Sequence, residues 1–275
     1  MSAAVHAGAT IRQLQAALPL DPLENRILLC HALGLPRVAL ITQSERALTG
    51  DEAARLEALV QRRVQGEPIA YIVGEREFFG LPFKVGLGVL IPRPDTELIV
   101  ELALERLPRG GRLLDMGTGS GAIAVACAHS RKDAGVTALD VSEDALAIAR
   151  ANASANGAAV RFLQSDWFTA VGGERFHLIA SNPPYIAAGD EHLAQGDLRF
   201  EPVGALTDHA DGLSALRIII AGAPEHLEPG GWLLLEHGYD QAEAVRDLLA
   251  ARGFIDVQSW RDLPGIERVS GGRLR

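Results

Sequence analysis

Apolar residues in the first 74 positions recur at the three- and four-residue intervals of amphipathic helices. Thr10 with Gln13, and Thr49 with Glu52, have the spacing of capping boxes, in which two side chains satisfy free backbone N–H groups at a helix start. An N-cap aspartate followed by a first-turn proline opens a further helix at position 21. The pattern predicts a small all-α helical bundle over residues 1–74.

The pattern changes to that of β-structure at residues 75–95. Aromatic and branched residues surround the turn signal Gly80-Leu81-Pro82, and a second apolar run, Val89 to Ile91, ends before two prolines. Turn signals between short apolar runs are typical of hairpins. We therefore expect a β-hairpin linker after the helical bundle.

From residue 96 onward, short apolar runs alternate with amphipathic helical segments. Apolar strands that are continuous rather than alternating are typical of a parallel sheet covered on both faces by helices. Turn signals near Gly265 and Gly271 predict two further strands, as an edge hairpin, in residues 255–275. The pattern predicts an α/β domain over residues 96–275. Its strands are expected at Arg112–Met116, Val136–Asp140, Val160–Gln164, His177–Ser181 and Gly231–Glu236, and its helices at 96–107, 121–130, 143–155, 212–227 and 240–252.

Composition and charge narrow the function classes. Of the 275 residues, 48% are hydrophobic and 22% are charged, which is typical of a globular protein and excludes a disordered or collagen-like chain. The net charge of -9 lies wholly in residues 75–275, because residues 1–74 balance seven arginines against seven acidic residues. Duplex nucleic acid is usually held by a broad basic surface. This charge therefore argues against direct nucleic-acid binding.

The two cysteines, Cys30 and Cys127, lie in apolar surroundings and form no spacing typical of a disulfide framework or a zinc site. No basic stretch precedes an apolar run near the start, and no apolar run approaches 18 residues. We expect a reduced, cytoplasmic protein with no bound metal and no membrane contact, acting as a monomer.

A glycine-rich turn directly follows the first predicted strand of the sheet. Glycine allows a sharp turn and lets a ligand approach the backbone. The spacing is G-x-G-x-G, which differs from the dinucleotide motif and from the phosphate-binding P-loop. Asp140 closes the next strand, 19 positions after Gly121, where a ribose-binding carboxylate is expected. The predicted cofactor contacts here are Gly117, Thr118, Gly119, Ser120, Gly121 and Asp140.

Three other residues at the same sheet edge add to this candidate site. Asp115 precedes the glycines and can either accept a hydrogen bond from a cationic group of the ligand or orient the loop amides. Asp166 and Trp167 follow the third strand and suit an adenine amine and ring, although Trp167 can also be a core aromatic. Together these features resemble the Rossmann-like class I methyltransferases that use S-adenosyl-L-methionine.

The segment Asn182-Pro183-Pro184-Tyr185 follows the fourth strand. Two prolines fix two φ angles and offer no N–H group, so the carbonyls of Asn182 and Pro183 point in set directions. The Asn182 side-chain oxygen and the Pro183 carbonyl can both accept hydrogen bonds from a planar NH2 group, while the Tyr185 ring covers its face. The segment therefore predicts a catalytic and substrate-binding site for an amide or exocyclic amine; a plain proline turn is the alternative.

Asn-Pro-Pro-Tyr in this position is similar to the motif of methyltransferases that act on planar nitrogens, including adenine-N6 enzymes and the glutamine-N5 methyltransferases of peptide chain release factors, the HemK or PrmC family. Further segments favour the second group, and the resemblance runs essentially end to end. Met116 stands where that family usually has leucine, which removes no functional group. The segments are Val89 to Glu97, Asn182 to Ile186, Phe200 to Pro202 with Ala205 and Leu206, Asp211 to Leu213, and Glu236 to Gly238.

The resemblance implies methyl transfer from S-adenosyl-L-methionine to the side-chain nitrogen N5 of the glutamine in the Gly-Gly-Gln motif of release factors. S-adenosyl-L-homocysteine is then the product, and the N-terminal helices help to dock the release factor. The cofactor would meet Gly117 to Gly121, Asp140, Trp167 and Asn182, and the glutamine would meet Asn182 to Tyr185. Arg93 and Glu97 belong either to the active site or to structural ion pairs. Phe200, Glu201 and Pro202 either shape the acceptor loop or only pack.

Two other function classes compete with this interpretation. The first is an adenine-N6 or guanine-N2 amino-methyltransferase acting on DNA or RNA, because the tetrapeptide does not distinguish an amide from an exocyclic amine. The charge distribution weighs against it. The second is a non-catalytic protein that keeps the fold as a binding scaffold, and the intact tetrapeptide argues against that.

Overall fold

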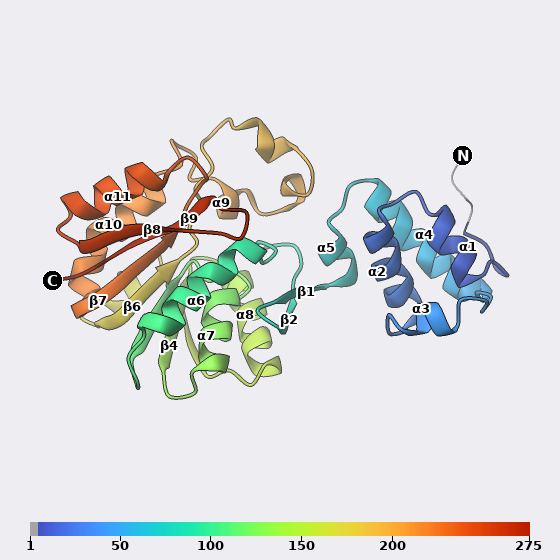
Figure 1. The fold of residues 1–275 in the computed structure, drawn as a ribbon, viewed down its shortest axis with the longest axis horizontal. Coiled ribbons are helices and arrows are strands. Elements are labelled where there is room, and N and C mark those ends of the chain that lie inside the picture. The colour runs from blue at the N-terminus through green and yellow to red at the C-terminus, as the bar shows by residue number, and fades with distance from the viewer. Residues whose placement is uncertain (1–4) are drawn as a thin grey trace. The chain divides into compact units, whose positions relative to one another are not determined.

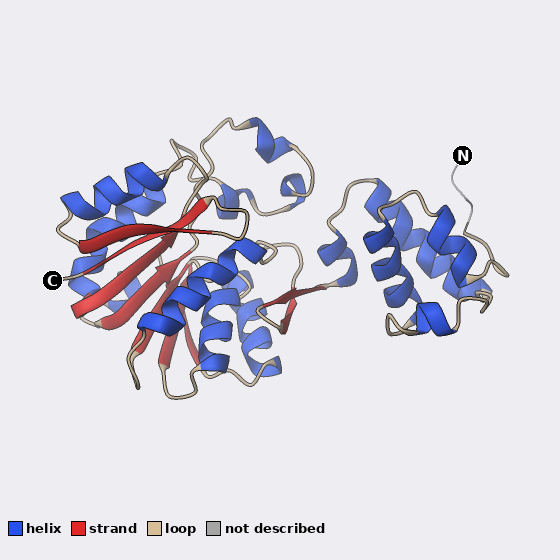
Figure 2. Ribbon diagram, in the orientation of Figure 1, coloured by secondary structure: helices blue, strands red, loops and turns tan. Residues whose placement is uncertain are grey.

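The computed structural model describes residues 5–275. The chain divides between Gly74 and Glu75 into two compact units, here called the N-terminal unit and the C-terminal unit. Each has its own hydrophobic core. Their helices and strands are drawn in Figures 1 and 2. None of the helices within residues 5–275 combines the length and apolar content needed to cross a membrane.

The N-terminal unit is a bundle of helices around a core that includes Leu28 and Leu56, both fully buried. Both expected capping boxes form, at Thr10 and Thr49. Gly34, with φ of 63°, ends the helix that starts at position 22. Cys30 of that helix is half-buried. The helices are α1 (Ile11–Ala17), α2 (Pro22–Leu33), α3 (Ala39–Thr42), α4 (Gly50–Val64) and α5 (Ile69–Val73).

A two-stranded hairpin, β1 (Glu75–Phe78) and β2 (Leu81–Lys84), opens the C-terminal unit. Its turn consists of Phe79 and Gly80, with φ of 53° and 73°, so the prediction of a turn at Gly80-Leu81-Pro82 is wrong by one residue. Positive φ at both central residues is typical of tight hairpin turns, because it matches the twist of the strands. Phe78 and Phe83 are buried in the core of the sheet domain, so the hairpin is part of the C-terminal unit.

The seven-stranded sheet has the order β5-β4-β3-β6-β7-β9-β8. The first five strands in this order are parallel, and the last two form an antiparallel hairpin along one edge (Figure 2). The prediction of a parallel α/β sheet with an edge hairpin is therefore confirmed. The strands are β3 (Arg112–Met116), β4 (Gly135–Asp140), β5 (Val160–Gln164), β6 (Phe176–Ser181), β7 (Leu227–Glu236), β8 (Ile255–Arg261) and β9 (Glu267–Arg273).

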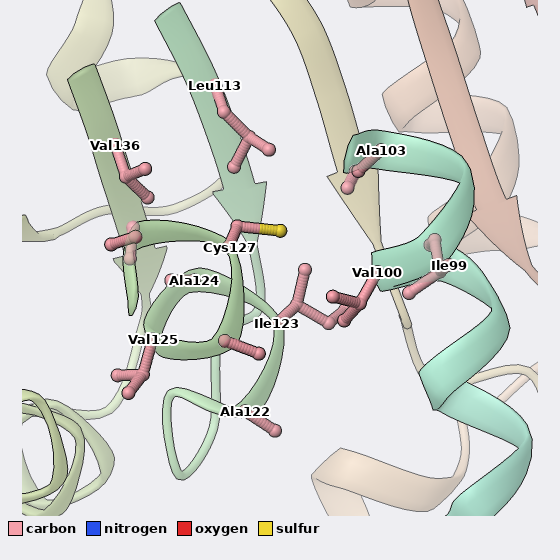
Figure 3. Packing of buried hydrophobic residues seen from close by; sticks show 14 of the residues in the cluster. Ile99, Val100, Ala103, Leu113, Ala122, Ile123, Ala124, Val125, Cys127 and Val136 are labelled. Carbon is pink, nitrogen blue, oxygen red and sulfur yellow. The ribbon is translucent and has the colours of Figure 1, made fainter. Parts of the chain in front are cut away.

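Helices cover both faces of the sheet (Figure 1). Leu113 and Leu114 of β3 are adjacent in sequence but belong to different buried clusters, one on each face, which explains the continuous apolar strands. In the first cluster, Ile123 lies near Val100, and Cys127 is fully buried beside Leu113 (Figure 3). The helices are α6 (Glu97–Arg106), α7 (Ala122–Ser130), α8 (Glu143–Ala155), α9 (Val203–Leu206), α10 (Ser214–His226) and α11 (Ala242–Ala251). Short 3-10 turns are η1 (Pro94–Thr96), η2 (Thr169–Val171), η3 (Glu191–Ala194) and η4 (Leu198–Phe200).

Gly121 fixes the approach of α7 to α8. It is the N-cap of α7, with φ of 87°. A Cβ atom placed on Gly121 would lie 3.1 Å from the Cβ of Ala149 in α8 and 3.2 Å from Cγ2 of Val125. This position therefore requires glycine both for its backbone conformation and for the close contact of the two helices.

We expect Gly121→Ala to lower the free energy of unfolding by about 2 kcal/mol or more, because a strained backbone and a steric contact act together. Gly157→Ala is the matched control. Gly157 also has a positive φ, 59°, but nothing lies within 4 Å of a Cβ there, so we expect a loss of about 1 kcal/mol. Denaturant unfolding of both variants measures the difference. Equal losses would show that the contact with Ala149 contributes nothing.

Candidate active site

The sheet places two loops side by side at the point where its strand order reverses. From β3 the chain adds β4 and β5 on one side, then crosses to β6 and β7 on the other. Ligands of open α/β sheets bind at the carboxyl ends of the strands at such a switch point. A cavity of about 470 Å³ lies there. Of the predicted site residues, Gly117, Thr118, Gly119, Ser120, Asp140, Asp166, Trp167, Asn182 and Pro184 line it.

The glycine loop is held in place by the neighbouring strand β4. Gly117 and Gly119 have φ of 68° and 55°, which the loop needs to turn back on itself. The N–H of Thr118 donates to the carbonyl of Leu139 at 2.9 Å, and the N–H of Gly119 donates to Oδ2 of Asp140 at 2.8 Å. Oδ1 of Asp140 accepts from the N–H of Ser142 at 2.9 Å. The Asp140 carboxylate is thus fixed at the rim of the cavity.

Asp115 lies beneath this loop and is completely buried. Its Oδ2 accepts hydrogen bonds from the Thr118 hydroxyl at 2.6 Å and from the N–H of Ala124 at 3.2 Å. Burial raises the pKa of the Asp115 carboxyl to about 7, although those hydrogen bonds lower it. Asp115 does not line the cavity that the described residues form. Of its two expected roles, these contacts support orientation of the loop.

Trp167 has both of the expected properties. It lines the cavity and also packs against the buried cluster on one face of the sheet. Its backbone has φ of 47°, which is rare outside glycine, and its carbonyl accepts from the Ser165 hydroxyl at 2.7 Å. The N–H of Ser165 donates to the carbonyl of Asp140 at 2.9 Å, which ties this loop to β4.

Asn182 begins the loop after β6. Just before it, the Ser181 hydroxyl donates to the carbonyl of Met116 at 2.7 Å, which joins the two loops at their base. The Nδ2 of Asn182 donates to Oγ1 of Thr96 at 3.2 Å. The backbone carbonyls of Asn182 and Pro183 accept no hydrogen bond from any described residue. They therefore keep their capacity to accept from a ligand.

Pro183 and Tyr185 do not line the cavity among the residues that the structure describes. Pro183 is buried, and the Tyr185 ring packs against the cluster on the α10 face. The Tyr185 hydroxyl donates to Oε1 of Glu236 at 3.3 Å. The ring therefore packs in the core, where the Glu236 carboxyl is the partner of its hydroxyl.

Arg93 and Glu201 form an ion pair across the cavity wall. Arg93 lines the cavity, whereas the Glu201 side chain is fully buried and also accepts from the N–H of Ile91 at 3.2 Å. Burial raises the pKa of Glu201, and Arg93 opposes that rise. Glu97 lies elsewhere and accepts from the N–H of Phe79 at 2.9 Å, so it stabilises the hairpin turn. The ion pair of Arg93 and Glu201 joins the segment before η1 to the loop that contains Pro202.

Several wall residues were not predicted as contacts from the sequence. Gly88, Thr96, Ser142, Gly204 and Ala205 line the cavity, and no motif or spacing along the chain marks them as contacts. Gly121 was expected to contact the cofactor; it does not line the cavity within the described chain, and its contacts are with α8. No group of three or more His, Cys, Asp or Glu side chains is arranged to hold a metal ion in the described residues.

Comparison with solved structures defines the class of the C-terminal unit as a methyltransferase fold. A methyltransferase from Pyrococcus furiosus has a TM-score of 0.55 at 23% identity, covering 78% of this chain and 95% of that chain. A T. thermophilus 16S rRNA N2 methyltransferase, solved with AdoMet and guanosine, has a TM-score of 0.54 at 23% identity, and the match covers 73% of this chain and 50% of that chain. The family model of the methyltransferase small domain matches residues 94–198.

The chain belongs to the release factor glutamine methyltransferase family. The protein of that name from Burkholderia pseudomallei is 56% identical over 275 residues, covering 97% of this chain and 96% of that protein. The protein of the same name from Neisseria gonorrhoeae is 51% identical, and the match covers 92% of this chain and 94% of that protein. The family model of the PrmC N-terminal domain matches residues 9–74, which is nearly the whole N-terminal unit.

The position of Asp115 predicts a pH-dependent gain in stability for Asp115→Asn. A buried carboxyl with a raised pKa keeps its proton in the folded state at pH values where the unfolded chain has already ionised, and this difference destabilises the folded state; the cost is absent below about pH 4 and grows as the pH rises to about 7. The rise in melting temperature relative to the parent should therefore be larger at pH 8 than at pH 5. Asp247→Asn, at an exposed position in α11, is the control and should show no such trend. An Asp115→Asn effect that is equal at both pH values would contradict the assignment.

Proposed function

We propose that this protein transfers a methyl group from S-adenosyl-L-methionine to the side-chain nitrogen N5 of the glutamine in the Gly-Gly-Gln motif of peptide chain release factors. Asn182 carries this proposal. It lines the cavity, it follows the strand next to the glycine loop, and its amide is held by Thr96. With the two carbonyls that accept no other hydrogen bond, it forms a row of acceptors suited to a planar NH2 group.

The cavity fits the cofactor in volume and in the chemistry of its walls. Its volume of about 470 Å³ is in the range of small-molecule sites. We assign the ribose hydroxyls to the Asp140 carboxylate, the adenine to Asp166 and Trp167, and the amino-acid end to the loop from Gly117 to Ser120. When bound, S-adenosyl-L-methionine supplies an electrophilic methyl group on a positively charged sulfur, and S-adenosyl-L-homocysteine remains afterwards.

The acceptor residues of the chain would act by position and by charge. We propose that the Oδ1 of Asn182 and the carbonyl of Pro183 accept the two N–H groups of the substrate amide. The nitrogen lone pair is then held perpendicular to the amide plane, and correct orientation contributes up to roughly 7 to 11 kcal/mol in favourable cases. Both hydrogen bonds strengthen as the nitrogen becomes positive, which stabilises the transition state more than the bound substrate. The proton leaves after the transfer, so no general base is needed before it.

Tyr185 has a supporting role in this proposal. Burial raises the pKa of the Tyr185 hydroxyl, so the group stays neutral and keeps its proton for Glu236. The buried ring and the two prolines hold the backbone of the acceptor row rigid. Pro184 lines the cavity beside Asn182, and we propose that it contacts the substrate.

The charge distribution favours a protein substrate in the cytoplasm over a nucleic acid. Residues 75–275 carry 19 basic and 28 acidic residues, which opposes the phosphate contacts that a duplex requires. A release-factor loop that visits ribosomal RNA is expected to be basic, so an acidic enzyme would complement it. The N-terminal unit, which is electrically balanced, is proposed to contact the body of the release factor. Methylation of an adenine or guanine amine is the alternative that the experiment must separate.

The test is transfer from labelled S-adenosyl-L-methionine to a purified release factor, followed by mass mapping of the Gly-Gly-Gln peptide. We expect label on the glutamine, none on a release factor whose Gly-Gly-Gln glutamine is replaced by alanine, and none on DNA or RNA. Asn182→Ala should keep cofactor affinity within a few-fold but lower turnover by about a hundredfold or more, because it removes an acceptor that acts in the transition state. Label on nucleic acid alone would refute the substrate, and unchanged turnover would remove Asn182 from the mechanism.

Asp140→Ala should weaken the affinity for S-adenosyl-L-homocysteine by about tenfold or more, since a hydrogen bond to a charged group contributes roughly 1.5 to 3 kcal/mol. The carboxylate also fixes Gly119, so its loss disturbs the loop in the same direction. Asp144→Ala, at an exposed position in α8, is the matched control and should bind as the parent does. Titration calorimetry measures both constants. Equal affinity in Asp140→Ala and the parent would exclude the ribose role.

A further inference from the structure

The side chain of Gln241, at the N-terminal end of α11, contacts three backbone segments that are far apart in the sequence. Its Oε1 accepts from the N–H of Gly238 at 2.9 Å. Its Nε2 donates to the backbone carbonyl of Tyr185 at 2.9 Å and to that of Gly212 at 3.3 Å. One side-chain amide therefore bridges the tetrapeptide that holds the acceptor row, the loop before α10 and the loop after β7.

The backbone partners fix which way the Gln241 amide faces. A backbone N–H can only donate and a backbone carbonyl can only accept, so the oxygen of the amide must face Gly238 and its nitrogen must face the two carbonyls. Turning the amide over would place two donors against each other at Gly238 and two oxygens against each other at Tyr185. Gln241 thus uses both ends of its amide at once, which an apolar side chain or a carboxylate of the same length cannot do.

The Gly238 end of this bridge is anchored in the sheet. The carbonyl of Gly238 accepts from Nδ1 of His237 at 2.8 Å and from the N–H of Gln241 at 3.1 Å. Burial lowers the pKa of the His237 imidazole, so the ring is neutral and its Nε2 accepts from the Ser270 hydroxyl at 2.7 Å. His237 and Ser270 are completely buried, and Ser270 belongs to β9. The oxygen of the Gln241 amide therefore faces a segment that buried contacts hold in place.

The nitrogen of the amide faces the end of the tetrapeptide, where space is tight. Gly212 has φ of 80°, and a Cβ atom there would lie 2.5 Å from the Tyr185 carbonyl oxygen and 2.8 Å from Nε2 of Gln241. Beyond Tyr185 the chain stays hydrogen-bonded to the segment before that loop, because the N–H of Ile186 donates to the carbonyl of Leu206 at 3.0 Å. The Gln241 amide therefore holds the Tyr185 carbonyl against the backbone of Gly212, with no space for a methyl group.

We propose that Gln241 is a positioning residue, which fixes the end of the acceptor row as the Ser181 hydroxyl fixes its start. That hydroxyl donates to the carbonyl of Met116 at 2.7 Å. Between these two points the φ angles of Pro183 and Pro184 are locked, so fixing both ends leaves the Pro183 carbonyl few directions. A misplacement of about 1 Å can lower turnover about a hundredfold. The inference rests on the proposed function for the role of this row as the methyl-acceptor site.

Two substitutions of similar length test the Gln241 amide. Gln241→Met removes both hydrogen-bonding ends, whereas Gln241→Glu keeps an oxygen for Gly238 and loses the donor to Tyr185. We expect both variants to lower kcat on the release factor by about tenfold or more. The affinity for S-adenosyl-L-homocysteine should stay within about twofold, since Gln241 does not line the cavity among the described residues. Gln258→Glu, at an exposed position in β8, adds the same charge and should keep kcat; a Gln241→Glu kcat within twofold of the parent would overturn the inference.

Gly212→Ala tests the position of the Tyr185 carbonyl without changing Gln241. The added methyl group would push that carbonyl from its place, so we expect kcat to fall by about tenfold or more. Gly230→Ala is the matched control, because Gly230 has φ of 79° but nothing lies within 4 Å of a Cβ there. It carries similar backbone strain and should keep kcat within about twofold. Equal kcat values in the two variants would contradict the inference, and this pair decides it if melting curves show that the Gln241 variants do not fold.

A measurement without cofactor or methyl acceptor keeps this inference distinct from the proposed function. Hydrogen exchange of assigned backbone amides compares the parent with Gln241→Met. We expect the Ile186 amide, which follows the held carbonyl, to exchange about tenfold faster or more in the variant, and the Thr118 amide of the glycine loop to exchange as in the parent. Equal exchange at Ile186 in both proteins would refute the positioning role. Faster exchange there would support it even if the release factor proves not to be methylated.

Discussion

The pairing of β3 with β6 is the constraint on which the rest of this site depends. These strands are far apart in the chain but adjacent in the sheet, and the Ser181 hydroxyl joins β6 to the carbonyl of Met116 at the end of β3. Because both strands are parallel and buried on both faces, neither can slip in register without moving apolar residues out of a core. The glycine loop and the segment from Asn182 to Tyr185 therefore lie at one edge of the sheet.

Around that edge, each of the two loops has a hydrogen bond to a buried carboxyl that does not line the cavity within the described residues. Asp115 accepts from the Thr118 hydroxyl of the glycine loop, and Glu236 accepts from the Tyr185 hydroxyl. Both carboxyls are buried and have one oxygen without a hydrogen-bond partner among the described residues, so each lowers the stability of the folded state. Arg93 and Glu201 act differently: their ion pair spans two wall segments and is partly open to solvent on the arginine side. Rigidity at this site thus comes from polar groups inside an apolar domain.

Much of this architecture follows from short-range signals in the sequence. Helix caps such as Thr10 and Thr49, and the continuous apolar strands, depend on neighbouring residues, so most of their positions could be predicted within a residue or two. The start of β7 is the exception, because that strand begins at Leu227, four residues before the predicted Gly231. The glycine loop and Asn182 could also be found, because glycine and proline restrict the backbone locally. These two local signals therefore predict two of the segments that form the walls of the cavity.

The rest depended on contacts between distant segments. The turn at Phe79 and Gly80 requires a positive φ at a phenylalanine, which local preference disfavours and burial of the hairpin compensates. Gly121 has the residue type of a ligand contact but is positioned against α8. Thr96 meets the Asn182 amide only because the fold brings η1 beside the start of the loop after β6, and no spacing along the chain encodes that contact.

The distribution of cysteine and tryptophan between the two units has a practical consequence. Cys127 is fully buried in the core under the glycine loop, and burial raises the pKa of its thiol, so it resists modification in the folded protein. Cys30, half-buried in α2, is the other cysteine of the sequence. Trp167, Trp232 and Trp260 all belong to the C-terminal unit. A thiol-reactive energy acceptor on Cys30 would therefore report, through quenching of tryptophan emission, the distance between the two units in the unmutated chain as a partner binds.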